Sequence, residues 1–179
     1  MSNKLKVLFV CSGNTCRSPM AVAVFRSVLR EEFSQCADFF EAGSAGLHAL
    51  PGLPASPLAV EALRELGIEL GPHRSRQVDG ELLRNADFVL TMTRAHRDEL
   101  AARYPEIVPR LSSPGDYLSG MAEDGVPDPI GLGLDAYRES CGRIRELVRA
   151  FLVRVVGQHC PGPGAKGGGN AASSTGDSA

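Results

Sequence analysis

One segment near the start of the chain has the residue types of covalent phosphoryl chemistry, reading Cys-Ser-Gly-Asn-Thr-Cys-Arg-Ser from Cys11 to Ser18. It directly follows an apolar segment, residues 6–10, which predicts that Cys11 ends a buried strand. If a helix begins near Ser18-Pro19, the backbone between strand and helix curls around one anion, because successive N–H groups and a helix N-terminus attract negative charge. The residues expected to surround this anion are Ser12, Gly13, Asn14, Thr15, Cys16, Arg17 and Ser18. We call residues 11–18 the cysteine loop.

Cys11 and Arg17 are the two residues of this loop that would act on a phosphoryl group. The guanidinium of Arg17 is a planar fork that matches two phosphoryl oxygens. The same positive field should lower the pKa of Cys11, so we expect a thiolate at neutral pH that can attack phosphorus. The sequence therefore predicts a phosphoryl-transfer site with a cysteine nucleophile.

Cysteine and glycine residues near a strand end also occur in buried cores, nucleotide-binding loops and zinc sites, and each of these fits the segment less well. A lone cysteine is most often a small buried hydrophobic residue, and we expect this for Cys36, Cys141 and Cys160. A P-loop NTPase needs the Lys of G-x4-G-K-[ST], and no Lys follows here. Cys11 and Cys16 do not form a C-x2-C pair and have no histidine nearby in sequence, so zinc is not expected. We expect no metal and no cofactor.

The composition is that of a small globular enzyme. A chain of 179 residues with a formal net charge of −2 predicts one domain and no basic field, so neither nucleic acid nor a membrane surface is an expected partner. The sequence has no apolar stretch long enough to span a bilayer, and its start does not resemble a signal peptide. Five cysteines in no regular framework fit a reducing compartment with free thiols, and we therefore expect a cytoplasmic protein.

Predicted strands alternate with predicted helices along the chain, which favours a parallel α/β sheet with helices on both faces. We expect four strands, at residues 6–10, 39–42, 87–92 and 107–111. We expect helices at residues 19–33 with Ser18 as the N-cap, 57–66, 82–85, 93–103 and 134–156. Cys11 would lie beyond the carboxyl end of its strand, where such sheets bind ligands. The domain is predicted to span residues 1–156, and the Gly- and Ser-rich residues 157–179 to form a disordered tail.

A second informative segment, residues 126–131, holds Asp128 between two prolines. Prolines on both sides keep a carboxylate in an extended loop. An Asp-Pro pair by itself is a turn signal, so the residues alone leave a structural role open beside a chemical one. We expect Asp135, Tyr137 and Arg138, at the start of the last helix, to be caps or surface residues.

The C-x5-R-S pattern of the cysteine loop resembles the low-molecular-weight protein tyrosine phosphatases, and the resemblance continues to about Val156. It includes Ser44-Ala45-Gly46, the Asp-Pro loop, and residues 59–63, 73–77 and 86–92. The resemblance implies the phosphotyrosine protein phosphatase I-like fold and an enzyme that hydrolyses phosphorylated proteins without a metal.

The resemblance also implies catalytic roles for three residues. Cys11 would form a phosphocysteine intermediate, and Arg17 would hold the phosphoryl oxygens. Asp128 would protonate the leaving group and then activate water against the phosphocysteine.

Four further residues would support this chemistry according to the same resemblance. Ser18 would hydrogen-bond the Cys11 thiolate, Asn14 would fix the shape of the loop, and His73 would brace Asn14. Cys16 would form a reversible disulfide with Cys11, which would make the protein redox-sensitive. From spacing alone, His73 could equally be an ordinary loop residue and Cys16 a filler.

The expected substrate depends on three positions around the loop. Tyrosine-specific members of the family usually have Ile where this chain has Thr15, aromatic residues after the Asp-Pro pair where it has Ile130, and a Trp on the wall that here holds His48. Thr15 resembles the bacterial protein arginine phosphatase branch, although that branch tends to have Phe in place of Ile130. We therefore expect phosphoarginine in proteins as the substrate, with phosphotyrosine as the alternative.

Two other classes of function remain as alternatives. An arsenate reductase of this fold would need additional thiols placed to resolve a Cys–arsenic adduct, and the candidates have no evident relation to Cys11 in the sequence. A phosphoprotein-binding module without catalysis would not need a nucleophile, an arginine and an acid together.

Overall fold

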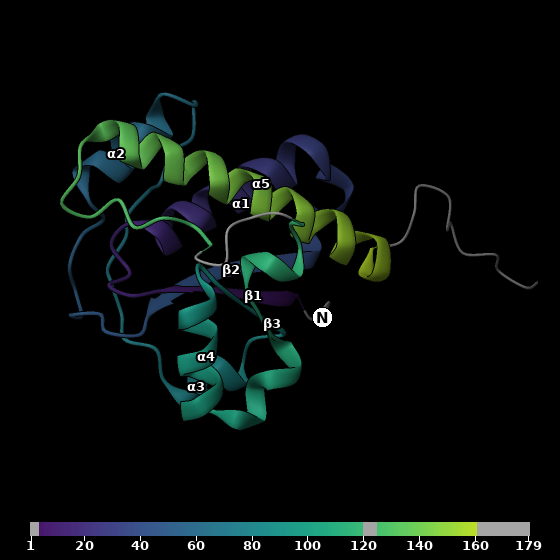
Figure 1. Cartoon of the computed structure of the whole chain (residues 1–179). Helices are drawn as coiled ribbons and strands as arrows, with labels where there is room; N and C mark the ends of the chain where they lie inside the picture. The colour runs from purple at the N-terminus through teal and green to yellow at the C-terminus, as the bar shows by residue number, and fades with distance from the viewer. Residues whose placement is uncertain (1–3, 120–124, 161–179) are drawn as a thin grey trace, which may run out of the picture.

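A parallel four-stranded sheet forms the centre of the computed structural model, which describes residues 4–119 and 125–160. The strands are β1 (Leu5–Cys11), β2 (Phe40–Gly46), β3 (Phe88–Thr91) and β4 (Leu111–Ser112). Their order is β2-β1-β3-β4, and all the neighbouring pairs are parallel. The predicted α/β fold is therefore confirmed, with β1 in the interior of the sheet and Cys11 at its carboxyl end (Figure 1).

Helices cover both faces of this sheet, as Figure 1 shows. One face carries α1 (Arg17–Glu32), α2 (Pro57–Arg64) and α5 (Leu134–His159), and the other carries α3 (Gly80–Arg84) and α4 (Arg94–Arg103). Three 3-10 helices complete the described elements, namely η1 (Ser34–Phe39), η2 (Pro105–Arg110) and η3 (Pro114–Asp116). No helix within residues 4–119 and 125–160 is long and apolar enough to cross a membrane.

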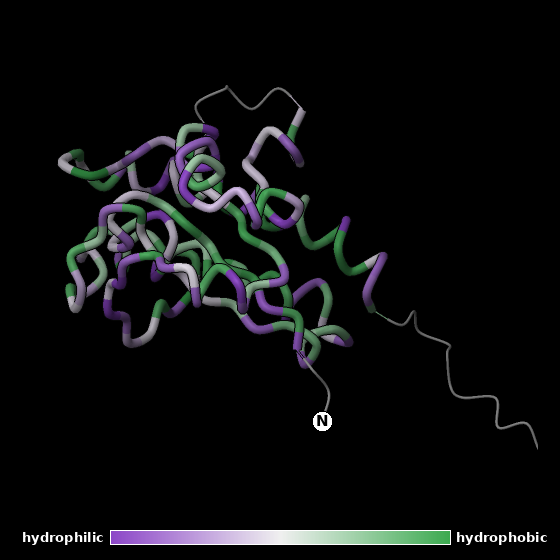
Figure 2. The backbone as a smooth tube through the Cα atoms, turned by 90° about the horizontal axis from the view of Figure 1, so that it is seen from below, coloured by the Kyte–Doolittle hydropathy of each residue, from purple (hydrophilic) through white to green (hydrophobic). Residues whose placement is uncertain are grey.

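Strand β1 is buried on both faces because its side chains alternate between two hydrophobic clusters. Val7 and Phe9 belong to the cluster beneath α1 and α5, whereas Leu8 and Val10 belong to the cluster beneath α3 and α4. Such two-sided burial is typical of a parallel sheet covered by helices and holds the residue after the strand at a fixed place. Figure 2 shows the hydrophobic segments running through the middle of the molecule, with hydrophilic ones outside.

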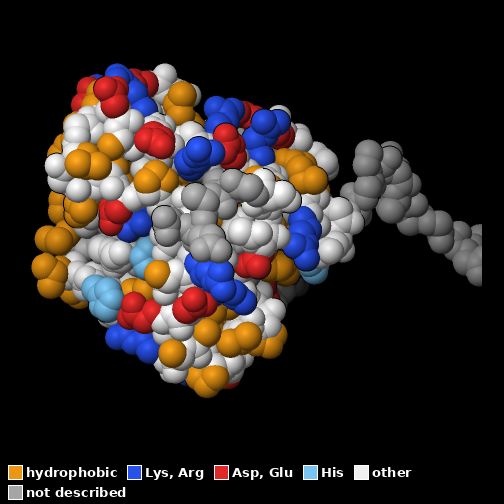
Figure 3. Space-filling model, in the orientation of Figure 1, with side chains coloured by type: hydrophobic (Ala, Val, Ile, Leu, Met, Phe, Trp, Pro, Cys, Tyr) orange, Lys and Arg blue, Asp and Glu red, His pale blue; other side chains and the backbone are white. Residues whose placement is uncertain are grey.

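The face shown in Figure 3 has Lys, Arg, Asp and Glu side chains interspersed with hydrophobic ones. It has no large area of a single charge sign, in agreement with the near-neutral balance of the sequence.

The predicted fourth strand was placed too early in the chain. Most of residues 107–111 lie in η2, and β4 begins only at Leu111. Pro105 and Pro109 explain the difference, because proline fixes φ near the helical value and supplies no N–H for a strand ladder.

The start of α1 also differs from the prediction. The helix begins at Arg17, its N-cap position is Cys16, and no side chain caps it. Ser18 therefore lies inside the first turn and is not the N-cap, which leaves its hydroxyl available to the cysteine loop. The other predicted helices are present, with ends shifted by a few residues.

The expectation that all thiols are free is wrong for two of the five cysteines. Cys36 in η1 and Cys160 after α5 form a disulfide across a sequence separation of 124 residues, whereas Cys11, Cys16 and Cys141 are free and buried. Sequence spacing could not reveal this pair, because it arises from the packing of α1 beside α5.

The last helix extends beyond the predicted boundary between domain and tail. Helix α5 runs to His159, beyond the expected end at Val156, and Cys160 is held by its disulfide. The rest of the predicted disordered tail, residues 161–179, lies outside the described residues.

Candidate active site

Asn14 gives the cysteine loop its curvature. Its φ is positive, 55°, although it is not a glycine, and it is fully buried. Its side-chain amide donates to Ser18 Oγ at 2.8 Å and to Ser44 Oγ at 2.9 Å, and its Oδ1 accepts from the backbone N–H of Arg76 at 2.9 Å. The His73 ring Nε2 lies 2.6 Å from the Asn14 carbonyl oxygen. These bonds hold a left-handed conformation that costs a non-glycine residue free energy.

The segment after β2 supports the loop from a second side. The backbone N–H groups of Leu47 and His48 donate to the carbonyl oxygens of Cys11 and Ser12, each at 2.9 Å. Gly46 lies so close that a Cβ at this position would collide with the Ser12 carbonyl oxygen. A side chain at Gly46, in the Ser44-Ala45-Gly46 stretch of the family resemblance, would therefore push the loop out of shape.

Ser18 is the polar neighbour of the nucleophile. Its Oγ lies 3.0 Å from Cys11 Sγ and accepts the hydrogen bond from Asn14. A hydroxyl has one hydrogen to give, and the Asn14 donor leaves that hydrogen free for the sulfur or for the more distant Ala45 carbonyl oxygen at 3.4 Å. When Cys11 is ionised, the sulfur is the stronger acceptor.

The prediction of a lowered pKa for Cys11 is wrong. Burial raises the pKa of the Cys11 thiol, whereas hydrogen bonds from Ser18, the charge of Arg17 and the backbone of Asn14 lower it. Burial outweighs the other effects because the thiol is almost fully buried and Arg17 is paired with a carboxylate. The groups that favour the thiolate are nevertheless all in contact with the site.

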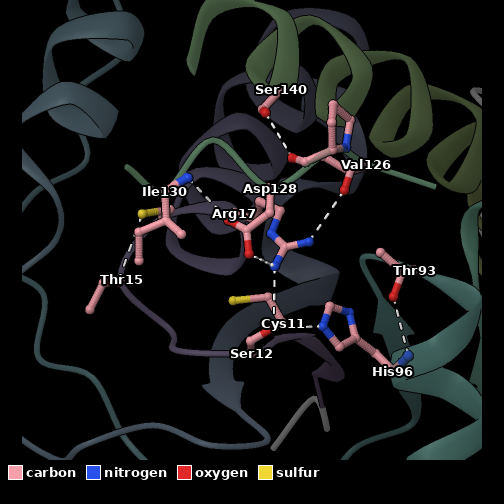
Figure 4. A network of polar contacts seen from close by, with 12 residues as sticks. Cys11, Ser12, Thr15, Arg17, Thr93, His96, Val126, Asp128, Ile130 and Ser140 are labelled. Atoms are coloured by element: carbon pink, nitrogen blue, oxygen red, sulfur yellow. Dashed lines mark hydrogen bonds and ion pairs between the residues drawn. The ribbon is translucent and has the colours of Figure 1, made fainter. Parts of the chain in front are cut away.

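Arg17 connects the cysteine loop to the Asp-Pro loop. Its side chain is 5% exposed, and Nη2 lies 2.6 Å from Asp128 Oδ2 and donates to Ser12 Oγ at 3.2 Å. Its Nη1 donates to the Val126 carbonyl oxygen at 3.3 Å. Segments more than a hundred positions apart in the sequence thus meet at one guanidinium, as Figure 4 shows.

Asp128 is more accessible than Arg17, with 43% of its side chain exposed. The loop that carries it is tied to the domain on both sides, because the Val126 N–H donates to the Met92 carbonyl oxygen at 2.8 Å and Ser140 Oγ donates to the Pro127 carbonyl oxygen at 2.9 Å. The Ile130 N–H donates to Asp128 Oδ1 at 3.2 Å. The carboxylate therefore has one oxygen on Arg17 and one at the end of its own loop, at the mouth of the site.

The three residues expected to set specificity lie around this mouth in different ways. Thr15 is half-buried, and its backbone is fixed by a hydrogen bond from the Ser56 N–H to its carbonyl oxygen at 2.8 Å. Ile130 is 62% exposed. The exposed His48 side chain turns toward α4, where its Nε2 lies 3.2 Å from Glu99. Figure 4 shows Thr15 and Ile130 on the same side of the site.

Several residues of the site were not found from the sequence. Tyr137, which we expected to be a cap or surface residue, is buried; Ser56 donates to its hydroxyl at 3.0 Å, and Cys16 Sγ lies 3.5 Å from it. His96 contacts the cysteine loop from α4. No local motif marks these residues, because their contacts depend on the tertiary packing. Within the described parts of the chain, no three His, Cys, Asp or Glu side chains are grouped as metal ligands.

Comparisons of the chain with known proteins identify the family to which its sequence is similar. The family described as low molecular weight phosphotyrosine protein phosphatase matches residues 6–159. A protein-arginine-phosphatase of Bacillus subtilis is 38% identical over 145 residues, covering 81% of this chain and 93% of that protein. A probable low molecular weight protein-tyrosine-phosphatase, EpsP of Ralstonia solanacearum, is 34% identical over 149 residues, covering 83% of this chain and 94% of that protein.

A solved structure has the same fold. The YwlE arginine phosphatase, in a cysteine-to-serine mutant with a phosphorylated active-site serine, superposes with a TM-score of 0.77 and 35% identity, covering 87% of this chain and 98% of that chain.

The contact between Ser18 and Cys11 leads to a first prediction. Ser18→Ala removes a hydrogen bond that lowers the pKa of Cys11, so the pKa should rise further, and alkylation of Cys11 by iodoacetamide should need a higher pH. Ser27→Ala is the matched control, because Ser27 is also buried on α1 but bonds to Glu31. An unchanged alkylation profile in Ser18→Ala would show that this hydroxyl does not stabilise the thiolate.

Proposed function

The chain belongs to the low molecular weight phosphotyrosine protein phosphatase family, and on that premise we propose that Cys11 removes the phosphoryl group from phosphoarginine side chains of proteins. Family membership makes the chain a cysteine-dependent protein phosphatase. The assignment of Cys11, Arg17 and Asp128 to its chemistry is carried by one observation. Arg17 belongs to the cysteine loop, which follows β1 and begins at Cys11, and its Nη2 lies 2.6 Å from Asp128 Oδ2. This contact brings the nucleophile, the arginine and the acid into one site.

In the proposed first step, the thiolate form of Cys11 attacks phosphorus in line and the bond from phosphorus to the departing nitrogen breaks. Asp128, in its carboxylic acid form, gives its proton to that nitrogen. Arg17 and the backbone N–H groups of the cysteine loop bind the phosphoryl oxygens, where charge is spread in the transition state. For this, Arg17 must exchange part of its contact with Asp128 for the incoming phosphoryl group.

In the proposed second step, the Asp128 carboxylate takes a proton from water while the water oxygen attacks phosphorus. The sulfur–phosphorus bond breaks, and inorganic phosphate and the Cys11 thiolate are formed. The phosphorylated active-site serine of the YwlE mutant supports a covalent intermediate in a relative. Ser18, which contacts Cys11 at 3.0 Å, would stabilise the departing thiolate.

Phosphoarginine is proposed as the substrate because the three positions expected to set specificity, Thr15, His48 and Ile130, hold none of the Trp, Phe or Tyr side chains that would face a phenyl ring. A guanidinium group is planar and polar, and its nitrogen can meet the carboxyl of Asp128, whereas a phenyl ring gains most from aromatic faces. Thr15 is a polar residue in the loop, and the exposed residue after the Asp-Pro pair is Ile130. Arginine and tyrosine phosphatases both occur among the relatives, so phosphotyrosine is the second candidate.

Replacing Thr15 tests this choice. Thr15→Ile should lower kcat/KM on a phosphoarginine peptide and raise it on the matched phosphotyrosine peptide, since it adds apolar bulk and removes a hydroxyl. Steric discrimination of about 1–3 kcal/mol would shift the ratio by roughly ten- to two-hundred-fold. Thr15→Val, which keeps the branched shape, separates the loss of the hydroxyl from the added bulk.

Two results would replace phosphoarginine by phosphotyrosine as the proposed substrate. One is a parent protein that already prefers the phosphotyrosine peptide. The other is a ratio that does not change in Thr15→Ile.

The arsenate reductase alternative loses two of its candidate thiols. Cys36 and Cys160 are bonded to each other. Cys141, the remaining candidate outside the cysteine loop, is buried on α5, and burial raises its pKa to about 11, which disfavours the thiolate needed to resolve an adduct.

We also propose that the enzyme is cytoplasmic and redox-sensitive, through a reversible disulfide between Cys11 and Cys16. Both thiols are free and buried in the structure, and Cys16 Sγ lies 3.5 Å from the Tyr137 hydroxyl. The Cys36–Cys160 bond departs from what a reducing compartment favours. Recovery of the protein from cells in a membrane or extracellular fraction would contradict the cytoplasmic location.

Oxidation of the purified protein tests the redox proposal. Mild peroxide should join Cys11 to Cys16 and abolish activity, and a thiol should restore it. The Cys16→Ser variant should instead lose activity irreversibly, as Cys11 passes to the sulfinic acid. Mass spectrometry of the parent protein that finds Cys11 as sulfinic acid beside a free Cys16 thiol would overturn the proposal.

A further inference from the structure

His96 is a buried histidine that belongs to the site but has no role in the chemistry derived so far. It lies in the first turn of α4, is 8% exposed, and places Nε2 2.9 Å from Ser12 Oγ. Its backbone N–H is held by Thr93 Oγ1 at 3.2 Å. Figure 4 shows the ring reaching Ser12 from α4, on the side of the site away from Thr15.

The position of the ring hydrogen of His96 follows from its surroundings. Burial and the charge of Arg17 lower the pKa of His96 to about 4; His48 also lowers it, while Asp128 and Glu99 raise it. The ring is therefore neutral near pH 7 and carries one hydrogen. Within residues 4–119 and 125–160, its buried Nδ1 has no hydrogen-bond partner.

A hydrogen on Nδ1 would leave a buried donor unpaired, whereas a hydrogen on Nε2 leaves only an acceptor unpaired. Buried donors without a partner are the rarer of the two in proteins. The hydrogen of His96 is therefore assigned to Nε2, which donates to Ser12 Oγ.

Ser12 then has both of its acceptor positions filled. It accepts from His96 Nε2 at 2.9 Å and from Arg17 Nη2 at 3.2 Å. A hydroxyl oxygen has two lone pairs and one hydrogen, so the hydrogen of Ser12 must point away from both donors. The same Arg17 nitrogen touches the Asp128 carboxylate at 2.6 Å, so Ser12 stands beside the place where Arg17 holds an anionic oxygen.

We propose that His96 is a positioning residue that turns the hydroxyl hydrogen of Ser12 toward the phosphoryl group held by Arg17. Ser12 thereby becomes a side-chain donor to the phosphoryl oxygens, in addition to the backbone N–H groups of the cysteine loop. This inference rests on the proposed function, because it assigns the donor to the phosphoryl group of the same reaction.

A different use of the pair is disfavoured by the structure. If Nε2 carried no hydrogen, His96 could take the proton of Ser12 and make it a second nucleophile, as in serine hydrolases. Such a base needs a third group that orients the ring through its other nitrogen. Nδ1 of His96 has no such partner in the described part of the chain.

Four variants test the proposal: Ser12→Ala, His96→Leu, His96→Gln and the double variant Ser12→Ala/His96→Leu. The two readouts are kcat/KM for hydrolysis of p-nitrophenyl phosphate and the Kd of inorganic phosphate from an NMR titration. Ser12→Ala and His96→Leu each lose one charge-assisted hydrogen bond to the phosphoryl group. In each variant kcat/KM should fall, and the Kd of phosphate should rise, by roughly tenfold. The double variant should be no worse than either single one, and His96→Gln, whose amide can still donate, should stay close to the parent.

Leu100→Ala is the control for damage to α4, because Leu100 is buried on the same helix and packs in the hydrophobic cluster beneath it, away from the hydrogen bonds of His96. It should lower the melting temperature and leave both readouts at the parent level. The proposal is overturned if Ser12→Ala keeps both parent values, if the losses in the two single variants multiply, or if His96→Gln is as impaired as His96→Leu.

Failure of the proposed function would show in the parent protein and not only in the variants. The parent protein would then hydrolyse neither p-nitrophenyl phosphate nor a phosphopeptide. The phosphate titrations of the same variants would still decide whether His96 and Ser12 act together on a bound phosphoryl anion.

Discussion

The hydrogen bonds of Asn14 are the constraint on which the site depends. They hold its backbone at a φ of 55°, and with it the curvature that directs the cysteine loop around one point. The amide is shared between Ser18 on α1, Ser44 on β2 and the backbone of Arg76. Since the same amide fills one lone pair of Ser18, it also decides that the Ser18 hydroxyl can serve the sulfur of Cys11. Loop shape and nucleophile environment are therefore set by one side chain.

Burial and polar contacts act in opposite directions on the pKa of Cys11. Burial makes a charged sulfur costly, while Ser18, Arg17 and the loop backbone reduce that cost. Arg17 is paired with Asp128, so its charge is only partly available to Cys11. The contact between Arg17 and Asp128 thus links the state of the nucleophile to the Asp-Pro loop, and a phosphoryl group that enters the loop must compete for the same guanidinium.

The local part of this structure could be predicted from the sequence. A buried strand ending in Cys11, a tight loop and a helix follow from hydrophobic pattern and turn residues, and the resemblance placed Asp128 in the site. The disulfide of Cys36, the burial of Tyr137 and the contact of His96 could not be predicted, because each arises from packing between elements distant in the sequence. The raised pKa of Cys11 was missed for a related reason, since the extent of burial is a tertiary property.

The central claim is that phosphate leaves the substrate on the sulfur of Cys11. Its most direct test uses Asp128→Asn with p-nitrophenyl phosphate, whose leaving group needs no proton, so that the first step proceeds while water is not activated and the intermediate accumulates. The variant is mixed with the 32P-labelled compound, denatured within a second, and digested for mass spectrometry. The account predicts the label on the peptide that contains Cys11, attached to sulfur. Label on another side chain, or hydrolysis without any labelled protein, would contradict it.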